Sequence, residues 1–277
     1  MTTTNSRQSF LGPRAAAEFE GQHIGIIGLC GGGSHIAQQL AHIGFKHFLL
    51  CDFDHVEDSN LTRMVGSRPS DAERGEKKTA VIHRMVTDIN PSASVQLIES
   101  KWQDQAEQLR SCSVIFGCVD SLAARDELER FCRRFLIPYI DLGMDVHLNN
   151  EGFSISGQVV MSLPDQSCMR CMGILRDDEL AKEYARYGVA GGRPQVVWPN
   201  GVLASAAVGQ YMSLIIPWSL DQKPSLLLEY DGNRQYIRES SKLNYLTGIA
   251  CKHFPRGQVL GDPFFDTQQT STLLYPE

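Results

Sequence analysis

Apolar runs alternate with amphipathic stretches along the first half of the chain. Runs at 24–27, 48–51 and 113–119 have the length and composition of buried parallel strands. Between the first two, Ile36 and Leu40 recur at the spacing of one helix face. This alternation predicts an α/β fold with a Rossmann-like, mostly parallel sheet flanked by helices.

The second half of the chain has a different pattern. Residues 137–141 form one more apolar run, and residues 153–163 alternate apolar and polar side chains as a half-exposed antiparallel strand does. Two further runs, 226–230 and 235–238, flank Asp231-Gly232-Asn233, which is typical of a hairpin turn. We therefore expect antiparallel strand additions to the parallel sheet in the C-terminal half.

The pattern also predicts how the chain is organised. Residues 1–20 are expected to form an N-terminal arm and helix, and residues 21–277 a single domain. Charged residues and paired glycines predict a mobile, solvent-exposed crossover loop at about 172–200. Frequent Gly, Pro, Gln and Thr predict an irregular tail at about 252–277.

Composition narrows the setting in which the protein works. The longest apolar stretch, 201–220, is interrupted by Gln210 and Pro217, so a buried or subunit-interface helix is expected rather than a membrane span. The net charge of −6 argues against nucleic acid as the main partner. Because the first residues lack a hydrophobic signal core, we expect a cytoplasmic protein.

A glycine-rich turn joins the first apolar run to the helix that follows it. Gly28, Gly31 and Gly33 lie in this turn, where backbone N–H groups and a positive helix end can face a phosphate. Asp52 ends the second run about 20 residues further on, where dinucleotide folds bind a ribose hydroxyl. A nucleotide is the predicted ligand, with a purely structural turn as the alternative.

The polar groups after Asp52 exceed what one ribose needs. Asp54, Asn60 and Arg63 follow within the same loop, which suits a ribose plus a triphosphate better than a dinucleotide. Because one acidic side chain is enough for the ribose, these extra groups favour nucleoside triphosphate chemistry over hydride transfer.

Two more charged residues complete the predicted clamp. Lys78 lies on a predicted helix that ends near Asn90, and Asp120 follows the run at 113–119, where a carboxylate can hold Mg²⁺ on phosphates. Together with Arg63 they suit phosphoryl or nucleotidyl transfer. The alternatives are that Lys78 and Lys77 form a solvated face and that Asp120 is only a helix N-cap.

The eight cysteines are expected to be thiols rather than disulfides. Cys51, Cys118 and Cys132 fall in apolar runs or helices and are predicted core residues. Cys168 and Cys171 form a C-x-x-C pair, which offers half of a tetrahedral zinc site. Free thiols and a redox pair are the alternatives.

Several motifs in one order make the chain resemble the ThiF/MoeB/HesA adenylyltransferases, the bacterial relatives of ubiquitin-activating enzymes. The resemblance runs from about residue 6 to 210. The motifs are Ser6-Arg7-Gln8, Gly28-x-Cys-Gly31-x-Gly33-Ser34, Asp52-x-Asp54-x-x-Glu57-x-Ser-Asn60-Leu-x-Arg63, Lys78, Ile89-Asn90-Pro91 and Asp120-Ser-x-x-x-Arg125.

The resemblance implies an activity: adenylation, from ATP and Mg²⁺, of the C-terminal glycine carboxylate of a small ubiquitin-like or sulfur-carrier-type protein. A conjugating or deconjugating enzyme is a further expected partner. The resemblance implies that Gly28, Gly31 and Gly33 form the phosphate loop and that Asp52 binds the ribose. It also implies that Asn60, Arg63 and Lys78 contact the phosphates and that Asp120 binds Mg²⁺. Because the family works as dimers, the resemblance implies a homodimer in which Arg7 reaches the partner's site.

The chain departs from the family pattern at several places, one of which is Met64, where glutamine commonly follows the arginine. Cys30 stands where the family usually has glycine, and a side chain there would be strained at positive φ. Relatives often complete the C-x-x-C zinc site with a second such pair, for which Cys251 and His253 are the nearest substitute. No cysteine occurs at 172–200, so transfer to a cysteine of the crossover loop is not expected.

Two other classes of function stay open at this point. One is an ATP-dependent relative with a small or RNA-borne carboxylate, similar to the threonylcarbamoyl-adenosine dehydratases. The other is a NAD-binding oxidoreductase or a catalytically inactive nucleotide-binding partner. Hydride transfer does not require the set of Arg63, Lys78 and Asp120, which disfavours the oxidoreductase.

Overall fold

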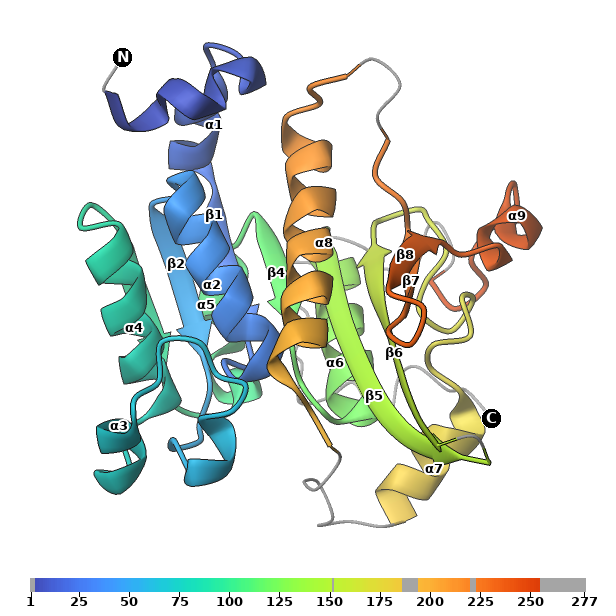
Figure 1. Cartoon of the computed structure of the whole chain (residues 1–277). Coiled ribbons are helices and arrows are strands. Elements are labelled where there is room, and N and C mark those ends of the chain that lie inside the picture. Colours follow the sequence, from blue (N-terminus) through green and yellow to red (C-terminus); the bar gives the residue numbers. More distant parts are fainter. Residues whose placement is uncertain (1–2, 151, 186–193, 220–222, 255–277) are drawn as a thin grey trace.

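In a computed structural model of the chain, eight strands form one sheet in the order β3-β2-β1-β4-β5-β6-β7-β8 (Figure 1). The structure describes residues 3–150, 152–185, 194–219 and 223–254. Strands β1 to β5 pair in parallel, whereas β5 to β8 pair antiparallel. The strands are β1 His23–Ile27, β2 His47–Cys51, β3 Ser94–Ile98, β4 Val114–Gly117, β5 Tyr139–Asn149, β6 Gly152–Ser162, β7 Leu227–Asp231 and β8 Tyr236–Glu239.

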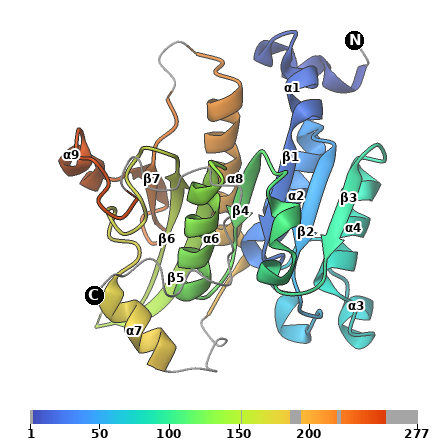
Figure 2. The same cartoon turned by 180° about the vertical axis from the view of Figure 1, so that it is seen from behind.

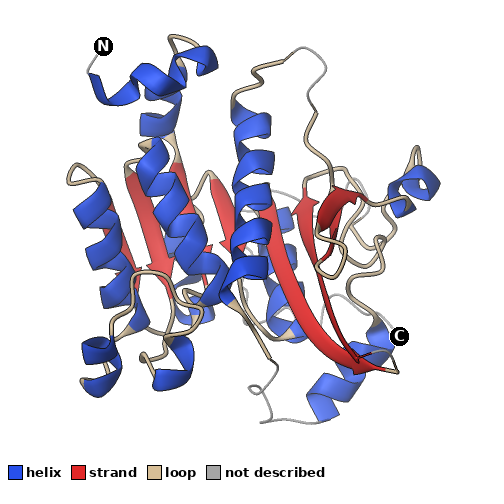
Figure 3. Cartoon of the chain, viewed as in Figure 1, coloured by secondary structure: helices blue, strands red, loops and turns tan. Residues whose placement is uncertain are grey.

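Helices cover both faces of the sheet (Figure 3). Helices α2, α4 and α8 lie on the face seen in Figure 1, and α6 lies on the face seen from behind in Figure 2. The α-helices are α1 Ala15–Gly21, α2 Gly31–Ile43, α3 Pro69–Glu73, α4 Lys78–Ile89, α5 Ala106–Leu109, α6 Leu122–Arg134, α7 Asp177–Ala185, α8 Val197–Ile215 and α9 Lys242–Leu246. Short 3₁₀ helices are η1 Thr3–Leu11, η2 Asp58–Asn60 and η3 Trp102–Gln105.

The alternation of side chains along each central strand divides the core into two layers. Ile24 and Ile26 of β1 pack toward α2 and α8, whereas Ile27 belongs to the cluster on the other face. That second cluster includes Leu128 and Phe131 of α6. Because the central parallel strands are covered on both faces, they are apolar at nearly every position, and the sequence pattern could identify them.

The predicted fold class is confirmed, and two element boundaries are corrected. Strand β5 continues from the predicted run at 137–141 to Asn149, because its second half pairs only with β6 and need not be apolar. Helix α8 begins at Val197, four residues before the apolar stretch at 201–220, because a helix tolerates Pro199 in its first turn.

The antiparallel half agrees with the prediction. Strand β6 corresponds to the predicted strand at 153–163, and β7 and β8 form the predicted hairpin. Among the helices of the described residues, none combines the length and hydropathy that a bilayer crossing needs. The crossover predicted as a loop at about 172–200 contains helix α7 and the start of helix α8; residues 186–193 and most of the predicted tail lie outside the described residues.

Candidate active site

The carboxyl ends of the adjacent strands β2, β1 and β4 meet at one edge of the sheet, beside the first residues of β5. In the parallel register Ile27 lies opposite Cys51 on one side and Gly117 on the other, and Gly117 lies opposite Asp141. The loops that follow β1, β2 and β4 therefore leave the sheet side by side. This is the edge at which open α/β sheets bind their ligands.

The glycine loop follows β1 and opens helix α2. Gly28 has a φ of +89°, and a Cβ there would collide with the carbonyl oxygen of Cys118. A Cβ at Gly33 would collide with the carbonyl oxygen of Gly28. Both glycines are therefore required for the close approach of the helix and the strands. Cys30 has a φ of −85°, so the strain that a positive φ would cause at this residue does not arise.

Asp52 is buried at the end of β2 and aims its carboxylate at the glycine loop. Its Oδ2 accepts a hydrogen bond of 2.8 Å from the Leu29 N–H, and its Oδ1 accepts one of 2.9 Å from the Asp54 N–H. Burial raises the pKa of Asp52, while the charge of Lys78 and these two N–H groups oppose that rise. The carboxylate is thus fixed beside the loop.

Lys78 begins helix α4 and is only 7% exposed, so it does not lie on a solvated face. Its Nζ lies 2.7 Å from Asp54 Oδ2. Burial acts to lower the pKa of Lys78, but the carboxylates of Asp52 and Asp54 outweigh it and the pKa is raised. The alternative of a solvated face is therefore wrong for Lys78, which carries a fixed positive charge at the site.

Asn60 and Arg63 lie in and after the short helix η2. Asn60 is buried, and its Oδ1 accepts the Glu57 N–H at 3.1 Å, which caps the helix. Arg63 donates from Nη1 to the Ser59 carbonyl oxygen at 2.7 Å, and its buried Nε has no hydrogen-bond partner in the described part of the chain. Arg63 therefore keeps donor capacity that the protein itself does not use.

Asp120 is exposed in the loop after β4. Its Oδ1 accepts a hydrogen bond of 3.3 Å from Gln195 Nε2, which comes from the end of the crossover. The N-cap of α6 is Ser121, whose hydroxyl accepts the Ala124 N–H, so the alternative of Asp120 as the cap is wrong. An exposed carboxylate oxygen is a ligand type that Mg²⁺ prefers.

Arg7 lies at the other end of the sheet. It is exposed on η1, which precedes the amino end of β1, whereas the arrowheads of β2 and β4 in Figure 1 point away from that end. The five residues of β1 alone span about 16 Å. Arg7 therefore cannot reach the glycine loop of its own chain.

Four side chains from two distant segments of the chain meet near helix α6. Cys168, Cys171, Cys251 and His253 each offer a ligand atom, and these atoms all lie within 4.8 Å of one another. The Sγ atoms of Cys168 and Cys171 are 3.6 Å apart, and that of Cys251 lies 3.7 Å from Cys171. Two sulfur ligands on tetrahedral zinc, each about 2.3 Å from the ion, are separated by about 3.8 Å.

The other cysteines are free thiols, as is each of these. Cys51 and Cys132 are buried core residues as predicted, whereas Cys118 is only half-buried. Burial raises the pKa of the Cys112 thiol to about 12.

Two residues of the site edge had no signal in the sequence patterns. Asn200 of α8 packs its amide against Gly31 and donates to the Val196 carbonyl oxygen at 3.0 Å. Gln195 reaches Asp120 from 75 positions away. Only the folded chain brings such residues together. The sequence did carry a signal for Asp141, because it is a charged residue at the end of an apolar run.

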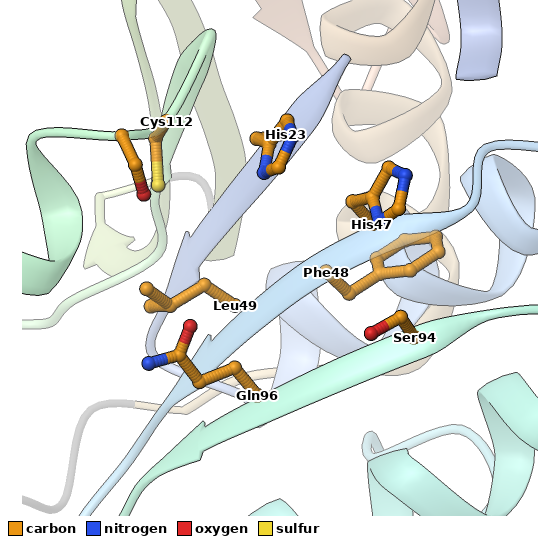
Figure 4. Close-up of a pocket in the computed structure, with 8 residues that line it drawn as sticks. His23, His47, Phe48, Leu49, Ser94, Gln96 and Cys112 are labelled. Carbon is orange, nitrogen blue, oxygen red and sulfur yellow. The ribbon is translucent and has the colours of Figure 1, made fainter. Parts of the chain in front are cut away.

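A pocket at the opposite end of the sheet does not belong to this site. Its lining includes His23, His47 and Ser94, the first residues of β1, β2 and β3 (Figure 4). The two imidazole rings stack with centroids 4.7 Å apart. These residues lie at the amino ends of the strands, away from the glycine loop.

Fold and site define a Rossmann-like α/β domain whose glycine loop, acidic strand end and buried lysine share one sheet edge. The sequence profile of the ThiF family matches residues 4–245. The chain therefore belongs to the ThiF family, and the resemblance predicted from its motifs is confirmed.

Relatives with named activities match about half of the chain. The molybdopterin-synthase adenylyltransferase of Salmonella typhimurium is 27% identical over 168 residues, which are 57% of this chain and 64% of that protein. The sulfur carrier protein ThiS adenylyltransferase of Escherichia coli is 28% identical over 151 residues, 53% of this chain and 56% of that protein. The tRNA threonylcarbamoyladenosine dehydratase of Haemophilus influenzae is 28% identical over 134 residues, 47% of this chain and 51% of that protein.

The chain spans less than two thirds of the length of these relatives. Among solved structures, E. coli MccB with succinimide has a TM-score of 0.68 and 19% sequence identity, with 87% of this chain and 72% of that chain covered. Such a likeness establishes the shared fold.

Proposed function

We propose that the protein is an ATP-dependent adenylyltransferase that activates the C-terminal glycine carboxylate of a small ubiquitin-like or sulfur-carrier protein. The observation that carries the proposal is the group of Asp52, Asp54 and Lys78 beside the glycine loop, with Asp120 on the neighbouring loop. Hydride transfer has no use for a buried lysine and a second carboxylate at this edge. Relatives that adenylate molybdopterin synthase or ThiS support the same activity.

Each residue has a role in this proposal. The N–H groups at the start of α2 face the phosphates, and Asp52 accepts a ribose hydroxyl. Lys78 and Arg63 neutralise phosphate charge, with Asn60 beside them. Asp120 would hold Mg²⁺, which when bound supplies further charge neutralisation at the phosphates.

The reaction needs no side-chain nucleophile. A carboxylate oxygen of the substrate attacks the α-phosphorus of ATP and forms the acyl-adenylate. The bond from that phosphorus to the bridging oxygen breaks, and pyrophosphate leaves with both electrons. Lys78, already charged and held by Asp54, stabilises the negative charge that develops on the leaving group.

The cluster of Cys168, Cys171, Cys251 and His253 is proposed to be a structural zinc site. All four ligands come from the protein, and such closed sites stabilise a fold rather than catalyse a reaction. Zinc would join the C-x-x-C turn to the segment after α9.

The test is to incubate the protein with ATP, Mg²⁺ and purified small proteins that end in Gly-Gly, and to measure exchange of labelled pyrophosphate into ATP. We expect exchange with at least one such protein, and a loss of roughly 10²-fold or more in Asp120→Ala or Lys78→Ala. Asp104→Ala, an exposed carboxylate on η3, is the matched control and should retain full exchange. Near-wild-type exchange in Asp120→Ala would refute the role given to that residue.

A second candidate is an RNA-modifying relative similar to the threonylcarbamoyladenosine dehydratase of Haemophilus influenzae. ATP consumption that depends on tRNA, and not on any protein with a Gly-Gly end, would favour it. The net charge of −6 stands against extensive phosphate contacts.

A further inference from the structure

A buried ion pair lies behind the Asp120 loop. Arg125 Nη1 of α6 is 3.5 Å from Asp141 Oδ2 of β5, and the two side chains are exposed by only 11% and 0%. The Tyr139 hydroxyl donates to Asp141 Oδ1 at 3.0 Å. Since burying two charges offsets most of their attraction, such a pair adds little net stability. Stability alone therefore does not explain why this ion pair lies beside the Asp120 loop.

The two strands leave room for this cluster at glycine positions. A Cβ at Gly117 would collide with the Tyr139 hydroxyl, and one at Gly143 would lie 2.7 Å from Arg125 Nη1. The guanidinium and the phenol therefore occupy space that any other residue at these two positions would take. The cluster is built into the backbone of β4 and β5.

The guanidinium of Arg125 also bridges two backbone segments. Its Nε donates to the Val119 carbonyl oxygen at 3.2 Å, and its Nη2 donates to the Leu142 carbonyl oxygen at 3.0 Å. Val119 directly precedes Asp120, in a loop of four residues between β4 and α6. The planar fork of an arginine offers two separate nitrogens at fixed positions to the two carbonyls, which the single ammonium of a lysine does not.

We propose that Arg125, oriented by Asp141, is a positioning residue that fixes the backbone of the Asp120 loop. It holds the Asp120 carboxylate where the proposed Mg²⁺ ligand must lie, so this consequence rests on the proposed function. Groups that orient a metal ligand commonly change metal affinity when they are removed.

Hydrogen–deuterium exchange of the ligand-free protein tests the positioning itself. In Asp141→Asn and Arg125→Lys we expect faster exchange in peptides that cover 117–122, with unchanged exchange in peptides that cover 28–34. The control is Asp71→Asn, which breaks another fully buried carboxylate from its 2.7 Å contact with Arg84 and should affect only the surroundings of α3. Unchanged exchange at 117–122, or faster exchange everywhere, would overturn the proposal.

The magnesium requirement separates positioning from a merely structural role. With ATP saturating, we expect the Mg²⁺ concentration that gives half of the thermal stabilisation to rise roughly tenfold in both single variants. The double variant Arg125→Met with Asp141→Asn leaves no unpaired buried charge, so its melting temperature should recover while the raised requirement persists. Recovery of both together would contradict positioning. If the wild type shows no Mg²⁺-dependent effect of ATP, the proposed function fails, and the exchange experiment still decides the positioning.

Discussion

Individual charges at the carboxyl edge owe their placement to a few short contacts. Lys78 is charged because two carboxylates outweigh its burial, and Asp52 is oriented by two backbone N–H groups. The residue types and their spacing could be predicted from the sequence. Which residue each charge contacts could not be predicted, because the ion pair between Lys78 and Asp54 depends on where α4 begins relative to the end of β2.

Burial separates the core thiols from reactive cysteines. The pKa values of Cys51 and Cys112 are raised to about 12, mainly by burial, so thiolate appears only as the pH rises toward that value. At pH 8 their thiolate fraction is about 10⁻⁴. We predict that alkylation of both by iodoacetamide, followed by mass spectrometry of the native protein, accelerates about tenfold per pH unit from pH 8 to 10. A plateau by pH 9 would contradict the raised pKa values.

At the scale of elements, helix α6 positions the turn that carries Cys168 and Cys171. Its Glu129 accepts the Met169 N–H at 2.8 Å, and its Arg133 donates to the Ser167 carbonyl oxygen at 2.9 Å. Both contacts hold the turn that carries Cys168 and Cys171. The C-x-x-C spacing indicated half of this cluster, but only the folded chain brings Cys251 and His253 to it.

Metal analysis of the purified protein should find about one zinc per chain. Chelation should lower the melting temperature, because the ion joins segments about 80 residues apart. Cys171→Ala should lose the zinc, whereas Cys112→Ala, a buried cysteine outside the cluster, should keep it. Protein prepared without chelator that contains no zinc, with Cys168 and Cys171 in a disulfide, would favour the redox alternative.

Coverage by helices decides which strands could be predicted from the sequence. Strands β1, β2 and β4 are covered on both faces, so their apolar runs are unbroken. The outer half of β5 pairs only with β6 and is half-buried or exposed, so its composition is mixed and it escaped the pattern. Pairing with a neighbour, rather than composition, extends such a strand.

At the scale of the whole molecule, Arg7 on η1 lies away from the glycine loop of its own chain, so the role that the family resemblance implies for it needs a partner subunit. We predict a homodimer in which each Arg7 serves the partner's site. Mixing inactive Arg7→Ala and Asp120→Ala subunits should restore about a quarter of the wild-type pyrophosphate exchange, because half of randomly mixed dimers are mixed and each holds one intact site. Confirmed mixed dimers without any recovery would exclude the role in the partner's site.

Nucleotide binding at the glycine loop is tested most directly by a thermal-shift comparison of the protein with ATP and Mg²⁺, ATP and EDTA, and NAD(H). A ligand at 100 times its Kd stabilises the native state by about 2.7 kcal/mol. We predict stabilisation by ATP that requires Mg²⁺ and is lost in Asp120→Ala. Stabilisation by NAD(H) alone would contradict adenylation and assign the glycine loop to a dinucleotide.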